Sequence, residues 1–210
     1  MNKLSLAVIV CVAGIVAGAR SGQASVRNYT ATITHDQEPG GVPDEGSSGT
    51  GSFTLNDDNP SAPFLTYSIQ LVGLDLDGNQ TPANANDNVQ RTHFHAAAFG
   101  INGGIVFGQI DVGQPSLRND LDDLVVNPVA GTITGVWDNN EGNGTTLAAQ
   151  IAAGVFNVDA QNRTGLYFNV HTPDHTGGEI RGQLILVPEP ASFAALALTA
   201  PLFAASRRRR

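Results

Sequence analysis

The segment GLYFNVHTP at residues 165–173 and the segment GGEIRGQL at residues 177–184 decide the fold. In both segments apolar and polar side chains alternate at every second residue, which is the period of a β-strand with one face in a core. The apolar positions are Leu166, Phe168, Val170, Ile180 and Leu184. The residues between the two runs, 172–178, contain Gly and Pro and predict the loop of an antiparallel hairpin.

The opposite face of this hairpin carries polar side chains. Symmetric register across the loop sets three pairs of residues opposite each other. The pairs are His171 with Glu179, Asn169 with Arg181, and Tyr167 with Gln183. We therefore expect a polar ladder along the outward face of the two strands.

The same two-residue period continues over residues 26–187, interrupted by segments rich in Gly, Asn, Asp and Pro. It predicts eight strands at residues 29–35, 49–55, 64–74, 90–99, 104–111, 131–137, 165–171 and 179–186. Residues 145–153 predict one short connecting helix, with a Thr near its start and Gly154 after it. Many short strands separated by turns predict an all-β sandwich or barrel, formed by residues 25–187.

The first 24 residues differ in character from this domain. Lys3 is followed by an uncharged apolar run at residues 4–19 and by small residues that end at Ala24. This layout is typical of a signal peptide removed by signal peptidase, and the run is shorter than the roughly 20 residues of a membrane span. Cys11, the single cysteine, lies within this run, so the mature domain is expected to contain no disulfide.

The domain is strongly acidic. Residues 25–187 contain five Arg, no Lys and eighteen acidic residues, a net charge of −13. Such a surface repels nucleic acid and anionic lipid, which argues against a role in binding DNA or RNA. Cations, including calcium, are the more natural small partners.

The last 23 residues form a third kind of sequence. Pro188, Glu189 and Pro190 end the final strand, residues 191–206 are apolar or small, and the chain closes on Arg207, Arg208, Arg209 and Arg210. This order of features resembles the PEP-CTERM sorting signal of Gram-negative bacteria. The resemblance implies processing of residues 188–210 by an exosortase-type enzyme, transient membrane anchoring, and delivery to the cell surface or extracellular matrix. A simple tail anchor is the alternative.

Histidines form the clearest candidate site. His93 and His95 are two residues apart on a predicted strand, so both rings lie on one face, with Cα atoms about 6 to 7 Å apart. A single transition metal ion can bridge that spacing, and we expect His171 and His175 to complete the ligand set. The alternative is that these rings bond to backbone or carboxylate groups and serve the scaffold alone.

Four motifs together resemble the CHRD (chordin-type) domain. They are THFH at residues 92–95, GINGGIVF at 100–107, GLYFNVHTP at 165–173 and GGEIRGQL at 177–184. The resemblance implies a Greek-key-like antiparallel fold similar to that of copper/zinc superoxide dismutase. It also implies a poorly defined role in extracellular interaction, with no known catalytic activity. By this analogy, His93 and His95 stand where the dismutase holds copper.

A second, weaker cation site is suggested by Asp75 and Asp77, which alternate before Gly78 as in a calcium loop. No distal Glu follows at the required spacing, so an Asx-rich turn is the favoured interpretation. The sequence also lacks a nucleophile elbow and a phosphate-binding Gly loop.

The sequence as a whole predicts an exported, non-catalytic surface or matrix protein that interacts with exopolysaccharide or surface proteins. The alternative is a copper- or zinc-binding redox protein that uses the histidines. We also expect apolar helices at the two ends of the chain.

Overall fold

Buried and exposed side chains alternate along the first three strands of the computed structural model, which describes residues 26–138 and 140–188. These strands are β1 (Val26–Ile33), β2 (Ser48–Asn56) and β3 (Phe64–Val72), and they pair as an antiparallel meander. Their inward side chains are aromatic or aliphatic, so one face of the meander is apolar.

Six further strands complete the sheet within the described residues. They are β4 (Arg91–Ala96), β5 (Gly104–Asp111), β6 (Val125–Asn127), β7 (Thr132–Asp138), β8 (Arg163–His171) and β9 (Ile180–Leu186). The helical elements are η1 (His35–Gln37), η2 (Pro115–Leu117) and α1 (Leu147–Ala152). Thr146 caps α1 by accepting the N–H of Ala149 at 3.2 Å.

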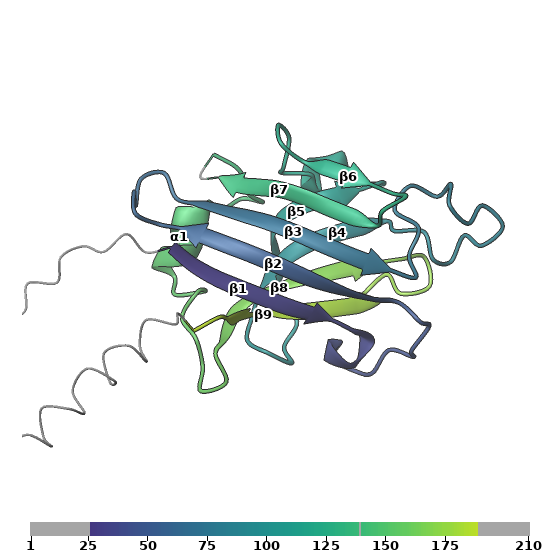
Figure 1. The fold of residues 1–210 in the computed structure, drawn as a ribbon, viewed down its shortest axis with the longest axis horizontal. Helices are drawn as coiled ribbons and strands as arrows, with labels where there is room; N and C mark the ends of the chain where they lie inside the picture. The colour runs from purple at the N-terminus through teal and green to yellow at the C-terminus, as the bar shows by residue number, and fades with distance from the viewer. Residues whose placement is uncertain (1–25, 139, 189–210) are drawn as a thin grey trace, which may run out of the picture.

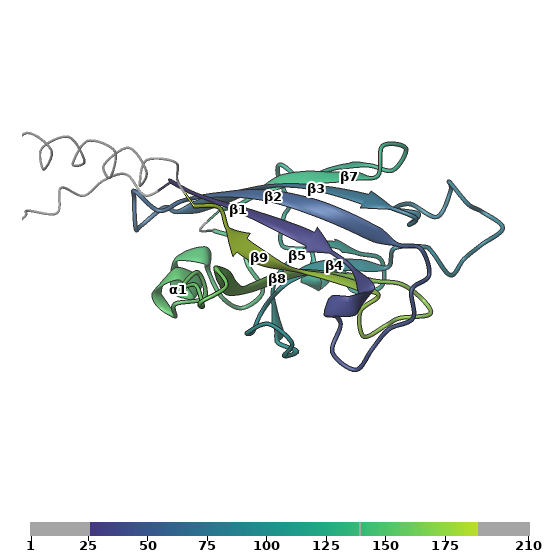
Figure 2. The ribbon, with the colours of Figure 1, turned by 60° about the horizontal axis from the view of Figure 1, so that its bottom comes forward.

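The nine strands form one antiparallel sheet in the order β5-β4-β8-β9-β1-β2-β3-β7-β6. The sheet curls so that β9, β8, β4 and β5 lie beneath β1, β2, β3 and β7, as Figure 1 and Figure 2 show from two directions. Aromatic side chains from both layers meet between them. Trp137 stacks on Phe107 with ring centroids 4.9 Å apart, and Phe94 contacts both Tyr67 and Phe53 edge to face.

This architecture confirms the all-β, sandwich-like fold expected from the sequence. Three pairs of neighbouring strands are not consecutive in the chain: β4 with β8, β9 with β1, and β3 with β7. The apolar segments expected as terminal helices, and the sorting residues from Glu189 onward, lie outside the described residues. Among the residues described, none of the helices has the length and apolar character needed to cross a membrane.

The polar face of β8 and β9 is buried, not outward as the sequence analysis expected. The register is the expected one, with Asn169 opposite Arg181 and Tyr167 opposite Gln183. The structure places all six ladder residues in the interior: Tyr167, Asn169, His171, Glu179, Arg181 and Gln183. The alternation of residues distinguishes the two faces of a strand but does not show what covers each face.

Two distant segments cover this polar face. Residues 97–103, between β4 and β5, receive hydrogen bonds from Arg181 through the carbonyls of Ala98 and Ile101. The side chain of Gln37, in η1, accepts the backbone N–H of Gln183 at 3.0 Å. Polar groups of the ladder are therefore mostly satisfied inside the protein rather than by water.

Apart from shifts of one to three residues at strand ends, the strands differ from the prediction in two places. The strand expected at residues 90–99 ends at Ala96, because residues 97–103 leave the sheet to cover the ladder. The strand β6 was not expected, since it has three residues and alternates only between exposed and half-buried positions. Strands are predicted from alternating apolar and polar residues, and a strand without buried side chains shows little of this alternation.

Candidate metal site

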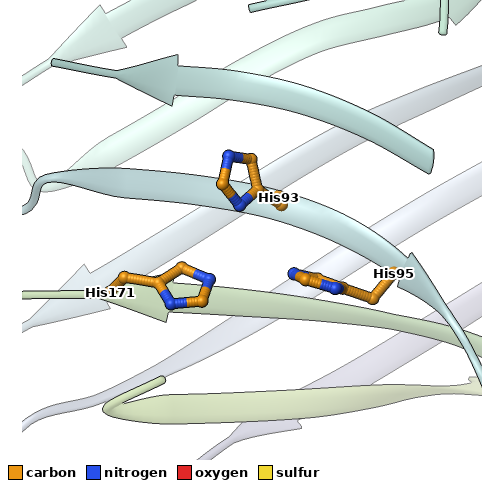
Figure 3. A group of neighbouring side chains, drawn as sticks. All are labelled: His93, His95 and His171. Atoms are coloured by element: carbon orange, nitrogen blue, oxygen red, sulfur yellow. The ribbon is translucent and has the colours of Figure 1, made fainter. Parts of the chain in front are cut away.

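Three histidines from two neighbouring strands meet on one face of the sheet. β4 pairs with β8 so that Arg91 lies opposite His171 and His93 opposite Asn169. His93, His95 and His171 each offer a ring nitrogen, and these atoms all lie within 4.8 Å of one another. Figure 3 shows the three rings grouped between the strands that carry them.

The orientations of His95 and His171 are fixed by backbone carbonyls. His95 Nδ1 lies 3.0 Å from the carbonyl oxygen of Gly103, and His171 Nδ1 lies 3.1 Å from that of Thr176. A carbonyl can only accept, so in each ring Nδ1 carries the proton and Nε2 carries a free lone pair. Both Nε2 atoms are buried and have no hydrogen-bond partner among the described residues.

His93 is completely buried, and within the described structure neither of its ring nitrogens makes a hydrogen bond. Its Nε2 lies 3.5 Å from Oδ2 of Asp111. The other oxygen of Asp111 accepts the backbone N–H groups of Gly113 and Gln114, which fixes the carboxylate beside the ring. A carboxylate behind a histidine is the usual support of a metal ligand, since it orients the ring and raises its basicity.

The cluster favours neutral rings. Burial lowers the pKa of His93 to about 3, with further lowering by His171, His95 and Arg91. Burial likewise lowers the pKa of His171 to about 4 and lowers that of His95. At neutral pH all three rings therefore keep a lone pair, which is the state that binds a metal.

These donors fit a transition metal. Imidazole nitrogens bind zinc or copper at about 2.0–2.1 Å, and three such ligands leave a further coordination position open. Tetrahedral bonds of this length set ligand nitrogens about 3.3 Å apart. The three ring nitrogens lie within 4.8 Å of one another, so small movements of the rings would bring them to that separation. Without a bound ion or water, each buried nitrogen that lacks a hydrogen-bond partner would destabilise the fold by about 1–3 kcal/mol, because it has lost its hydration.

Two residues of this site were missed by sequence reasoning. Asp111 ends β5, and it reaches His93 only because β5 pairs with β4. Gly108, in the same strand, has no space for a Cβ atom, which would lie 1.8 Å from the carbonyl oxygen of Leu117 and 3.1 Å from Cδ2 of His93. Neither residue carries a local motif, so only the strand pairing identifies them.

His175 does not join the cluster, contrary to the sequence expectation. Its Nε2 lies 3.3 Å from Oε1 of Glu45, and the group of three neighbouring histidines does not include it. The physical reason is the turn at residues 172–178. The carbonyl of Thr176 faces His171, so the side chain of His175 is directed away from the cluster and toward Glu45, which precedes β2.

Asp75 organises a turn, as the favoured interpretation expected. Its Oδ1 accepts the N–H groups of Asp77 and Gly78, and its Oδ2 accepts the N–H of Thr81 at 2.8 Å. Burial opposes ionisation of Asp75, but these backbone donors outweigh it and lower its pKa to about 2. The side chain of Asp77 accepts the N–H of Asn79 in a second Asx turn.

The comparisons with known proteins agree with this fold. Residues 29–184 match the CHRD domain, a span that starts within β1 and ends within β9. No curated protein and no solved structure matches the chain. Because the match covers nearly the whole described domain, including both histidine-bearing strands, the chain belongs to the CHRD domain family.

Proposed function

We propose that this protein is an exported CHRD-domain protein that binds one transition metal ion, copper or zinc, through His93, His95 and His171. One observation carries the proposal. The Nε2 atoms of His95 and His171 are buried and unpartnered beside His93, while their Nδ1 atoms are committed to carbonyl oxygens. Buried polar atoms nearly always have a hydrogen-bond partner, so three neighbouring rings with nitrogens that no protein group satisfies point to a bound ion or water.

Measuring the metal content of the purified full-length chain tests this site. We expect one equivalent of copper or zinc to bind the wild-type protein, and His93→Ala or His95→Ala to lose it. His175→Ala is the matched control, because this histidine lies outside the cluster and should leave the stoichiometry unchanged. Metal binding that survives both cluster substitutions, or no stoichiometric metal in the wild type, would contradict the proposal.

We assign metal binding to the three histidines and no redox reaction. The CHRD family supports a non-catalytic role, in which the ion would stabilise the domain or take part in an extracellular contact. Exopolysaccharide and surface proteins are the partners that the sorting tail suggests. The net charge of −13 over residues 25–187 makes nucleic acid an unfavourable partner.

Export and sorting complete the proposed function. Residues 1–24 would direct secretion and be removed by signal peptidase, and residues 188–210 would be processed by an exosortase-type enzyme after transient anchoring in the membrane. Comparing the cell-associated fraction of the full chain with that of a variant lacking residues 188–210 tests the second step. A variant that stays cell-associated to the same extent would remove the sorting role.

A further inference from the structure

A second group of ligand-type side chains lies on the β5–β7 side of the fold, in the segment between η2 and β6. Asp120, Asp122 and Asp123 each offer a carboxylate oxygen, and these oxygens all lie within 4.8 Å of one another. Asp120 is completely buried, whereas Asp122 and Asp123 are exposed. One carboxylate thus reaches into the interior and two remain at the surface beside it.

The segment is held in place from both sides. The backbone N–H groups of Asn119 and Asp120 donate to the carbonyl of Gly108 in β5, at 2.8 and 3.2 Å. Oδ1 of Asp123 accepts the N–H of Val136 in β7 at 2.6 Å. The three carboxylates are therefore gathered by the sheet itself rather than by a free loop.

A fourth acidic residue, Glu141, lies beside the three aspartates. Oε1 of Glu141 accepts the N–H of Leu121 at 3.2 Å, and Oε2 accepts the N–H of Asp138 at 3.3 Å. Among the described residues, none of these four acids forms an ion pair with Arg or His.

Asp120 supplies the independent sign of a ligand. Its Oδ2 accepts the hydroxyl of Tyr67, but its Oδ1 is buried and lacks any hydrogen-bond partner within the described structure. An unpartnered carboxylate oxygen in the interior is costly unless a cation compensates it.

We infer that Asp120, Asp122 and Asp123, with Glu141 beside them, form a binding site for a calcium ion. Calcium takes oxygen ligands at about 2.3–2.6 Å, so ligand oxygens around one ion lie up to about 5 Å apart. The observed separations meet that limit. The all-oxygen donor set separates this site chemically from the histidine cluster, whose nitrogen donors suit softer ions.

Terbium luminescence and calcium titration of the full-length chain test the inference. Trp137 is the only tryptophan of the chain, and its Nε1 donates to the carbonyl of Glu141 at 3.1 Å. It therefore lies next to the site and should sensitise a bound terbium ion. We expect calcium to displace terbium with a dissociation constant of about 10⁻⁴–10⁻³ M, the range of extracellular calcium modules.

The variants are chosen to separate binding from folding. Asp122→Asn changes an exposed ligand and should weaken calcium binding by about tenfold or more, because the charge of the ligand set sets its affinity. Asp174→Asn, an exposed aspartate in the β8–β9 loop, should bind as the wild type does. His93→Ala should also retain calcium binding.

Three results would overturn the inference. They are no binding up to millimolar calcium, equal binding by Asp122→Asn and wild type, and loss of calcium binding in His93→Ala. The last result would place the ion at the histidines. Binding of both calcium and the transition metal is measured on the His93→Ala variant. A failure of the calcium proposal is therefore distinguishable from a failure of the histidine metal site.

Discussion

The guanidinium of Arg181 lies over the ring of Tyr167, with Cζ 3.4 Å from the ring centroid, and both side chains are buried. On the β4 side of the same ring, His95 stacks at 5.0 Å between centroids. Tyr167 thus connects the buried cation to the proposed metal site. The hydroxyl of Tyr167 also accepts the N–H of Gly103, whose carbonyl fixes the His95 ring.

Replacement of Arg181 should be strongly destabilising. Arg181→Ala leaves the carbonyls of Ala98 and Ile101 without their donor and removes the cation packed on Tyr167. We expect a loss of about 3–5 kcal/mol in the free energy of unfolding, measured by urea denaturation. Arg118→Ala, at an exposed position, is the control and should change stability by no more than about 0.5 kcal/mol. Equal losses in the two variants would argue against the covering role of residues 97–103.

Gly108→Ala should disturb the histidine cluster by steric overlap. The new methyl group would lie 1.8 Å from the carbonyl oxygen of Leu117, so β5 or η2 must shift. We expect a destabilisation of about 1–3 kcal/mol and weaker metal binding, measured by thermal denaturation and metal titration. Gly113→Ala has no atom within 4 Å of the added methyl group and should behave like the wild type. If Gly108→Ala matches this control in both measurements, the close approach is not a constraint.

Asp111→Asn should weaken the proposed metal site without dismantling the fold. Asparagine retains an oxygen that can accept the N–H groups of Gly113 and Gln114, but it loses the negative charge 3.5 Å from His93. We expect a metal affinity about 10- to 100-fold lower, measured by competition with a chelator. Unchanged affinity would show that Asp111 does not support the His93 ring.

Glu38 should make the stability of the domain depend on pH. Burial raises its pKa from 4.5 to about 7, against the opposing charge of Arg181 and a hydrogen bond from Asn169. The folded state therefore binds more protons than the unfolded state between these values. Its stabilising contribution is complete below pH 4.5 and is lost as the pH rises through 7.

The variant Glu38→Gln isolates this effect. Between pH 5 and pH 8, roughly spanning the shift, the wild type should lose about 1–3 kcal/mol relative to Glu38→Gln. Urea denaturation of both proteins across this range measures the difference, and the histidines cancel because both proteins contain them. Parallel stability curves for the two proteins would mean that Glu38 titrates normally.

The sequence predicts the strands and their register well because both depend on local alternation. The pairing of Asn169 with Arg181 follows from hairpin symmetry alone. What covers the ladder could not be predicted, since residues 97–103 reach it from another part of the chain. From sequence alone, a polar strand face is therefore predicted to face solvent, because the segment that covers it is not known.

The histidine cluster was partly predictable for a related reason. The spacing of His93 and His95 places them on one face, but their approach to His171 depends on the nonlocal pairing of β4 with β8. Asp111 and Asp120 depend on further pairings and contacts of β5 and β7, so no short motif identifies them.

The two layers of the sheet are joined where β1 pairs with β9, through Tyr29 with Leu186 and Thr30 with Ile185. The N–H of Val187 also donates to the carbonyl of Asn28. The first and last strands of the domain therefore close it together, and this contact cannot form until the chain has been synthesised as far as Val187. Such high contact order slows folding. If the chain is exported as proposed, slow folding would leave the polypeptide unfolded for longer and so give it time to cross the membrane.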